Sequence, residues 1–117
     1  MKTINVLGTE YTVKFQTEKD NPKLKGNDGL FELYTQEIIL DLSNKNEPTA
    51  YANVEAYYDK VFRHELFHAI FAEAGLMDYC NDEILINALA TLYPKIQKIM
   101  EKAKVFDFLE GEKDDRR

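Results

Sequence analysis

The stretch between Pro48 and Gly75 constrains the fold more than any other part of the chain. Apolar side chains recur along it at helical spacing and cover more than one narrow stripe. Thr49 is a suitable N-cap after the proline, and Gly75 is well placed to end a helix. The pattern therefore predicts a central helix from about Thr49 to Ala74, with the other elements packed around it.

Both histidines of the chain fall in this helix, within the segment HELFH. His64 and His68 are four residues apart, so they lie on one helical face and can bind one metal ion. Zinc suits two neutral imidazoles. Glu65 is turned about 100° from His64, so we expect it to reach a metal-bound water rather than the metal. This arrangement is typical of zinc peptidases, in which the metal acidifies the water and the glutamate is the general base.

A catalytic zinc site requires a third protein ligand, and the chain has no third histidine. Glu83 is the first candidate, because it begins a downstream helical segment that can pack antiparallel to the first helix. Asp78 and Asp82 are the next candidates, and Cys80 is a weaker one. Asn87 lies one turn after Glu83, and we expect it to hold a ligating histidine by hydrogen bonding.

The transition state of peptide hydrolysis also needs a donor for the developing negative charge. The sequence offers several candidates near the relevant segments and does not distinguish between them. They are Tyr57, Tyr58, Arg63, Tyr79 and Tyr93.

At HELFH, and at Glu83 four residues before the polar Asn87, the chain resembles the zincin metallopeptidases with a glutamate ligand. It looks most like the small ImmA/IrrE-type peptidases and related HEXXH proteins of phages and mobile elements, over about residues 37–92. The resemblance implies zinc bound by His64, His68 and Glu83, with Glu65 as base. One departure is the segment 85–87, Leu-Ile-Asn, where those relatives have an acid, alanine and asparagine.

The residues before the helix predict strands. Alternating apolar residues at 3–7 and 10–16 predict a hairpin that turns at Gly8-Thr9, and residues 30–34 and 37–42 predict two more strands. We expect an α+β fold of the minimal zincin-like kind, with a short antiparallel sheet followed by the long HEXXH helix and one or two further helices. By the resemblance, strand 37–42 or its hairpin neighbour would pair with an extended substrate.

Asn81 is a candidate cap for the next helix, and Pro94 predicts a kink or break at Tyr93-Pro94 before a last amphipathic helix. The length of 117 residues fits one domain. We expect this domain to span residues 1–110, with a charged, flexible tail at residues 111–117.

The composition and charge of the chain limit the classes of partner that it can bind. A formal net charge of −6 argues against nucleic-acid binding, and no apolar run approaches the ~20 residues of a membrane helix. The first residues lack a signal-peptide core, and a single cysteine, Cys80, suits a reducing compartment, so we expect a cytoplasmic protein.

The leading prediction is a zinc endopeptidase that acts on a protein or peptide, such as a regulatory protein. One alternative is a zinc-binding protein-interaction module of the same fold without proteolytic turnover. Another is a metal-free helical protein that dimerises through its tyrosine-rich helix.

Overall fold

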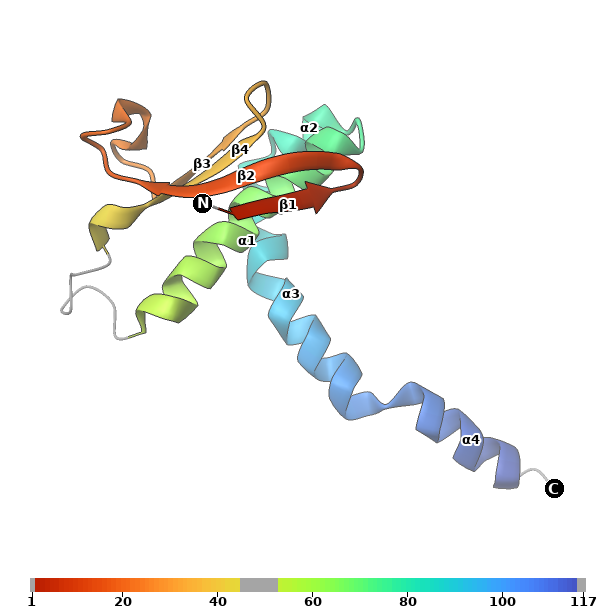
Figure 1. Cartoon of the computed structure of the whole chain (residues 1–117). Helices are drawn as coiled ribbons and strands as arrows, with labels where there is room; N and C mark the ends of the chain where they lie inside the picture. The colour runs from red at the N-terminus through yellow and green to blue at the C-terminus, as the bar shows by residue number, and fades with distance from the viewer. Residues whose placement is uncertain (1, 45–52, 116–117) are drawn as a thin grey trace.

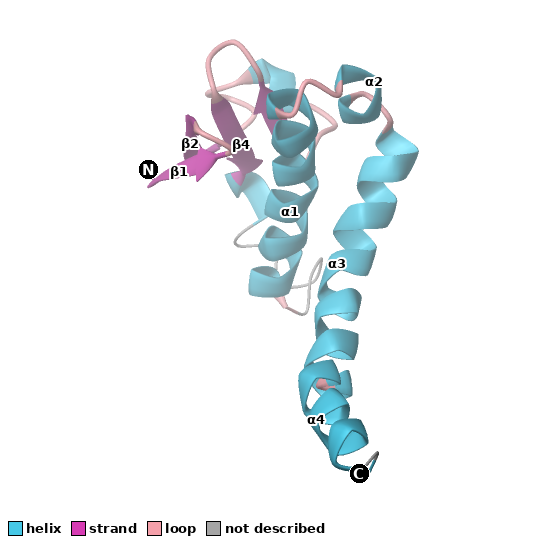
Figure 2. Ribbon diagram, turned by 90° about the vertical axis from the view of Figure 1, so that its right-hand side faces the viewer, coloured by secondary structure: helices cyan, strands magenta, loops and turns pink. Residues whose placement is uncertain are grey.

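A computed structural model describes residues 2–44 and 53–115 and gives an α+β fold (Figure 1). The elements in chain order are β1 (Lys2–Val6), β2 (Thr9–Gln16), η1 (Pro22–Leu24), β3 (Gly29–Glu32), β4 (Glu37–Asp41), η2 (Leu42–Asn44), α1 (Val54–Glu73), α2 (Met77–Cys80), α3 (Glu83–Ala103) and α4 (Val105–Asp115). Figure 2 shows α1 between the sheet and α3. The predicted order of a small sheet, a long motif helix and further helices is confirmed.

The first two strands form an antiparallel hairpin whose turn differs by one residue from the prediction. The turn residues are Leu7 and Gly8, not Gly8 and Thr9, because Val6 pairs with Thr9. Leu7 and Gly8 have φ values of 50° and 98°, as in the tight turns that match the twist of a hairpin. The Asn5 side chain accepts a hydrogen bond of 2.9 Å from the Gly8 N–H and stabilises this turn.

The sheet is mixed, whereas the sequence predicted an antiparallel one. Its strand order is β1-β2-β4-β3, with β4 parallel to β2 and antiparallel to β3. The segment after β2 crosses to the far edge before β3 begins, so the β3–β4 hairpin returns β4 to the middle of the sheet. Ile38, Ile39 and Leu40 are at most 3% exposed, as expected for a strand covered on both faces. β3 is consequently an edge strand.

The core lies between the sheet and α1. Tyr11 and Ile38 from the sheet are fully buried and cluster with Val61 and Ala69 of the helix. The Tyr11 hydroxyl donates a 2.6 Å hydrogen bond to Glu73, which also accepts one from Thr9. Burial, and then the hydrogen bond to Glu73, raises the pKa of Tyr11, while the two donated bonds lower the pKa of Glu73. These contacts tie the end of α1 to β2.

The limits of the helices differ in part from the prediction. The predicted cap Thr49 lies outside the described residues, and α1 begins at Val54 with Asn53 as its N-cap. Gly75 follows the end of α1 with a φ of 78°, which confirms its predicted role. Asp82 rather than Asn81 caps α3, because the Asp82 carboxylate accepts a 3.1 Å hydrogen bond from a backbone N–H in the first turn.

Of the kink or break predicted at Tyr93-Pro94, the break is wrong, because α3 runs through Pro94. Proline lacks the N–H that would bond to the carbonyl four residues earlier, which is that of Ala90. The Nε of Arg63 on α1 donates a 2.6 Å hydrogen bond to this carbonyl oxygen. A contact between helices therefore satisfies the group that proline leaves free, and the helix continues.

This contact predicts a coupling between two positions on different helices. Arg63→Met should lower the free energy of unfolding by about 1–3 kcal/mol, because it leaves a partly buried carbonyl without a donor. In a Pro94→Ala background the new backbone N–H can donate a hydrogen bond to that carbonyl. Arg63→Met should then lower the free energy of unfolding much less. Urea unfolding of the four chains at one zinc concentration measures the difference. Equal costs in both backgrounds would contradict this explanation.

The C-terminal part of the chain is helical further than predicted. α3 includes the segment expected as a separate amphipathic helix, and α4 takes in residues 111–115 of the predicted tail. Residues 116–117 lie outside the described part of the chain. Among the described helices, none combines the length and apolar character needed to cross a bilayer.

Candidate metal centre

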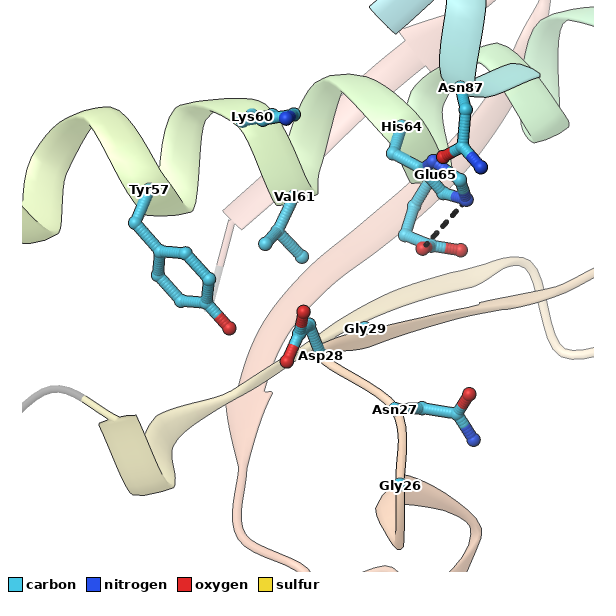
Figure 3. Close-up of a pocket in the computed structure, with 10 residues that line it drawn as sticks. All are labelled: Gly26, Asn27, Asp28, Gly29, Tyr57, Lys60, Val61, His64, Glu65 and Asn87. Carbon is cyan, nitrogen blue, oxygen red and sulfur yellow. Dashed lines mark ion pairs between the residues drawn. The ribbon is translucent and has the colours of Figure 1, made fainter. Parts of the chain in front are cut away.

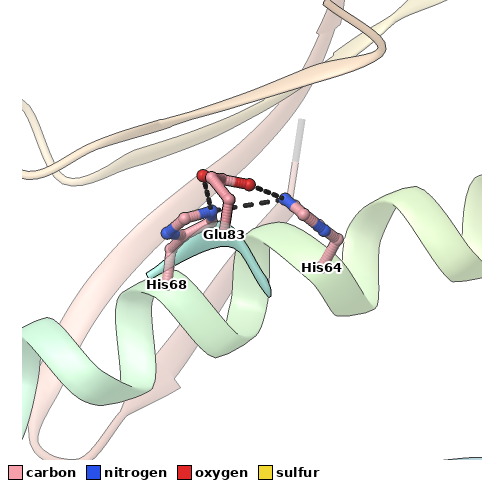
Figure 4. Close-up of side chains that lie close together, drawn as sticks. All are labelled: His64, His68 and Glu83. Atoms are coloured by element: carbon pink, nitrogen blue, oxygen red, sulfur yellow. Dashed lines mark hydrogen bonds and ion pairs between the residues drawn. The ribbon is translucent and has the colours of Figure 1, made fainter. Parts of the chain in front are cut away.

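The histidines and Glu83 meet where α1 and the start of α3 lie side by side (Figure 4). The chain ends α1 at Gly75, turns through α2, and begins α3 at Glu83, directly after the capping Asp82. The carboxylate of Glu83 is thereby placed over His64 and His68. The structure brings together the three residues that the sequence proposed as ligands.

The ligand atoms have the separations that a metal site requires. The Nε2 atoms of His64 and His68 are 3.3 Å apart. The Glu83 oxygens are 2.9 Å from Nε2 of His68 and 3.2 Å from Nε2 of His64. Two ligands each about 2.0–2.1 Å from a tetrahedral zinc lie roughly 3.3 Å apart, so the cluster fits one zinc ion with little movement. The Glu83 side chain is 62% exposed, so one side of the cluster faces solvent.

His68 is fixed in orientation by its other ring nitrogen. Its Nδ1 lies 2.6 Å from the backbone oxygen of Cys80. A carbonyl oxygen only accepts hydrogen bonds, so Nδ1 carries a proton, and in the neutral ring Nε2 has the free lone pair. Phe31 of β3 stacks against the imidazole, with ring centres 6.2 Å apart and planes 9° apart. Sequence reasoning missed this orienting role of the Cys80 backbone.

His64 is more open, and Asn87 lies beside it (Figure 3). Burial and the neighbouring His68 lower the pKa of His64, while Glu83 and Asn87 act in the opposite direction. The lowered pKa favours the neutral imidazole, which is the form that binds metals. The structure places Asn87 beside His64, and its role in holding a metal ligand stays a prediction.

Glu65 lies beside His64 and is buried, at 7% exposure (Figure 3). Its nearer carboxylate oxygen is 3.9 Å from Nε2 of His64, and Glu65 does not belong to the set of possible ligands. Burial, then the negative charges of Glu83 and Asp28, raises the pKa of Glu65 to about 8. A carboxylate in this setting is a stronger base than an exposed glutamate.

Gly29, at the start of β3, allows the sheet to approach Glu65, and no sequence pattern indicated this. A Cβ added at Gly29 would lie 2.9 Å from a methyl group of Val61 and 3.2 Å from Cγ of Glu65. The missing side chain therefore sets how closely β3 lies to the catalytic candidates. Only the three-dimensional packing reveals this requirement.

We predict that Gly29→Ala displaces Glu65 and destabilises the fold by about 1–3 kcal/mol, as overpacking does. Zinc should still bind, because the atoms nearest to the added methyl group belong to Val61, Glu65 and Ile39 and not to the three candidate ligands. Thermal unfolding and metal analysis measure the two effects. Gly26→Ala is the control: Gly26 has a φ of 76° and open space around it, so this change strains the backbone without overpacking the core. Unchanged stability in Gly29→Ala would contradict the packing argument.

Two hollows meet at the cluster and share His64 and Glu65. The first runs along α1 past Tyr57 and Lys60 and is bordered by the loop before β3 (Figure 3). The second runs along β3 toward α2 and includes Phe31 and Cys80. The site is thus open on both sides and has the edge strand β3 as one wall. Strand 37–42, which the sequence offered first for substrate pairing, is internal, so its hairpin neighbour β3 is the available edge.

The remaining ligand candidates lie outside the cluster. Asp82 is occupied as the N-cap of α3, and the side chain of Cys80 is buried. Asp78 lies in α2 and does not join His64 and His68.

The candidate oxyanion donors differ in whether they line a hollow beside Glu65. Arg63 bonds to Ala90, and the Tyr58 hydroxyl donates to the backbone oxygen of Asp41 at 2.7 Å. Tyr79 packs on Phe71, and Tyr93 packs on Phe67. Tyr57 is the candidate that lines a hollow together with Glu65.

Comparison with known proteins adds no relative. No protein-family model matches the chain, and neither the curated proteins nor the solved structures contain a match. The function has to be argued from the site.

Proposed function

We propose that this protein is a zinc-dependent endopeptidase in which His64, His68 and Glu83 hold the metal and Glu65 is the general base. The observation that carries the proposal is the meeting of three ligand groups with a buried, non-ligating carboxylate beside them. Structural zinc sites use four protein ligands and need no base. The arrangement fits a catalytic site better.

The donor set supports zinc in particular. Two imidazoles and one carboxylate are among the ligand sets of catalytic zinc, in which a fourth position stays open for water or substrate. When bound there, zinc would polarise a substrate carbonyl and acidify a water molecule. The exposed side of Glu83 leaves room for such a molecule.

Glu65 would accept the proton of the attacking water and pass it to the leaving nitrogen. Its burial keeps competing water away, and its side chain is held between α1 and β3 by the close approach at Gly29. The charge of a bound cation would oppose the raised pKa that Glu65 has in the metal-free protein. The residue would therefore be ionised and ready to accept a proton in the loaded enzyme.

The substrate would be a protein or peptide in extended conformation. β3 is an edge strand and forms one wall of the hollow that passes His64 and His68. An extended peptide could add to this edge by backbone hydrogen bonding, which places its carbonyl groups along the cluster. A regulatory protein in a reducing cytoplasm is a suitable target, given the free thiol of Cys80. The net charge of −6 does not favour nucleic acid as a partner.

A library of peptides from a digested proteome tests this function. Zinc-loaded protein should produce new peptide ends that mass spectrometry detects, the chelated protein should not, and added zinc should restore cleavage. Cleavage that survives complete removal of the metal would overturn the proposal. Zinc binding without cleavage of peptides or of folded partners would instead support the interaction module that the sequence left open.

A further inference from the structure

The C-terminal part of the protein extends away from the body as an arm, which we define as residues 92–111 of α3 and α4 (Figure 1). The Cα radius of gyration is 18.3 Å, whereas a compact chain of this length would have about 13 Å. The principal extents are 68 × 38 × 27 Å. The elongation is due to the arm, which extends beyond the sheet and α1.

Apolar side chains are exposed along the whole arm. In α3 they recur at positions 92, 96, 99 and 103, which is the spacing of helices that pack lengthwise on one another. Exposed apolar surface of this extent marks an interaction site. The large members and their exposed fractions are Leu92 46%, Tyr93 47%, Ile96 47%, Ile99 66%, Met100 67%, Val105 68%, Phe106 74%, Phe108 65% and Leu109 52%.

The two parts of the arm carry opposite charge. Residues 95–104 contain four lysines and one glutamate, a net charge of +3. Residues 105–111 contain Asp107 and Glu110 and no basic residue, a net charge of −2. The basic segment spans ten residues and the acidic segment seven, so they are roughly 15 Å and 10 Å long, and the acidic segment fits within the length of the basic one.

In this structure α4 cannot fold back to cover the exposed apolar side chains of α3 in the same chain. α3 ends at Ala103 and α4 begins at Val105, so Lys104 alone connects them. Two helices that fold back on each other need a loop of 2–5 residues. Every described side chain from Glu101 to Gly111 is exposed, as expected when the partner is another molecule.

We propose that the arm binds the arm of a second copy of this chain in antiparallel orientation, with the two-fold axis beside Lys104. The basic segment of each arm then lies along the acidic segment of its partner, and the apolar faces are buried between them. A two-fold interface needs such a self-complementary surface. A parallel arrangement would place lysines opposite lysines. Apolar burial supplies the affinity, and the charges select the orientation.

Sedimentation velocity and light scattering of the full chain test the dimer. The wild type should reach twice the chain mass of 13.6 kDa as its concentration rises through the micromolar range. Ile99→Glu with Phe106→Glu should give a monomer, because charges are then placed in the apolar face. Far-UV circular dichroism serves as the control that the variant remains folded, whether or not zinc is bound.

Charge reversal tests the orientation. Lys98→Glu with Lys102→Glu should weaken the dimer by about tenfold or more, and so should Asp107→Lys with Glu110→Lys. The chain that carries all four changes should dimerise again, because opposite charges face each other once more. An equimolar mixture of the two separately reversed chains should form a heterodimer for the same reason.

Three results would overturn the proposal. One is a wild-type monomer at every concentration, and another is a dimer that the apolar substitutions leave unchanged. The third is a chain with all four charge changes whose dimer is as weak as the dimers of the chains with two changes. The proposal does not depend on catalysis, so an inactive but dimeric protein would support it.

Discussion

Glu65→Gln should leave the bound zinc in place and reduce peptide hydrolysis by roughly 10²–10⁴-fold, the contribution of a positioned general base. Glutamine keeps the shape of the buried side chain but cannot accept a proton. Glu65 is outside the group of possible ligands, so its substitution should not change the metal content. The rate constant for zinc-loaded protein on a peptide identified from the library measures the effect.

The control for this prediction is Glu55→Gln. Glu55 lies in the first turn of the same helix and is exposed, so the loss of its charge should leave hydrolysis unchanged. If the Glu65 variant keeps the wild-type rate, Glu65 has no part in the proton transfer. If it loses zinc along with activity, Glu65 contributes to binding and its assigned role is wrong.

His68→Ala should lower zinc affinity by more than about 100-fold, because even the loss of an outer partner of a ligand costs 10–100-fold. The substitution removes a ligand atom and also the contact through which Cys80 fixes the ring. Zinc should then no longer raise the melting temperature, since stabilisation by a ligand depends on its affinity. Competition with a chromophoric chelator gives the affinity directly.

Three further variants separate ligation from folding. His64→Gln changes the more exposed histidine and should also abolish tight zinc binding. This variant tests ligation even if His68→Ala fails to fold. Glu83→Ala should weaken zinc markedly, whereas Asp78→Ala should have no effect. Equal losses for Glu83→Ala and Asp78→Ala would show that the third ligand is wrongly assigned.

The parts of the site that the sequence predicted depend on local geometry. The shared face of His64 and His68 follows from helical pitch alone, and Gly75 ends the helix through its own backbone conformation. Glu83 and Asn87 are one turn apart in α3 for the same reason. Their approach to the histidines required only that α3 pack back on α1.

The parts that the sequence missed depend on contacts between distant segments. Pro94 alone predicts a break, and the helix continues because Arg63 of another helix bonds to the carbonyl of Ala90. The importance of Gly29 comes from its distance to Val61 and Glu65, which no local pattern shows. No single-strand pattern reveals that β4 pairs in parallel with β2, since pairing depends on where the intervening segment crosses the sheet.

Anomalous diffraction at the zinc absorption edge, from crystals of the zinc-loaded protein, tests the central claim most directly. We expect one peak per chain at about 2.0–2.2 Å from Nε2 of His64, Nε2 of His68 and a carboxylate oxygen of Glu83. Glu65 should lie beside the ion without binding it. A peak held by other residues, or two histidines without an ion at saturating zinc, would contradict the account.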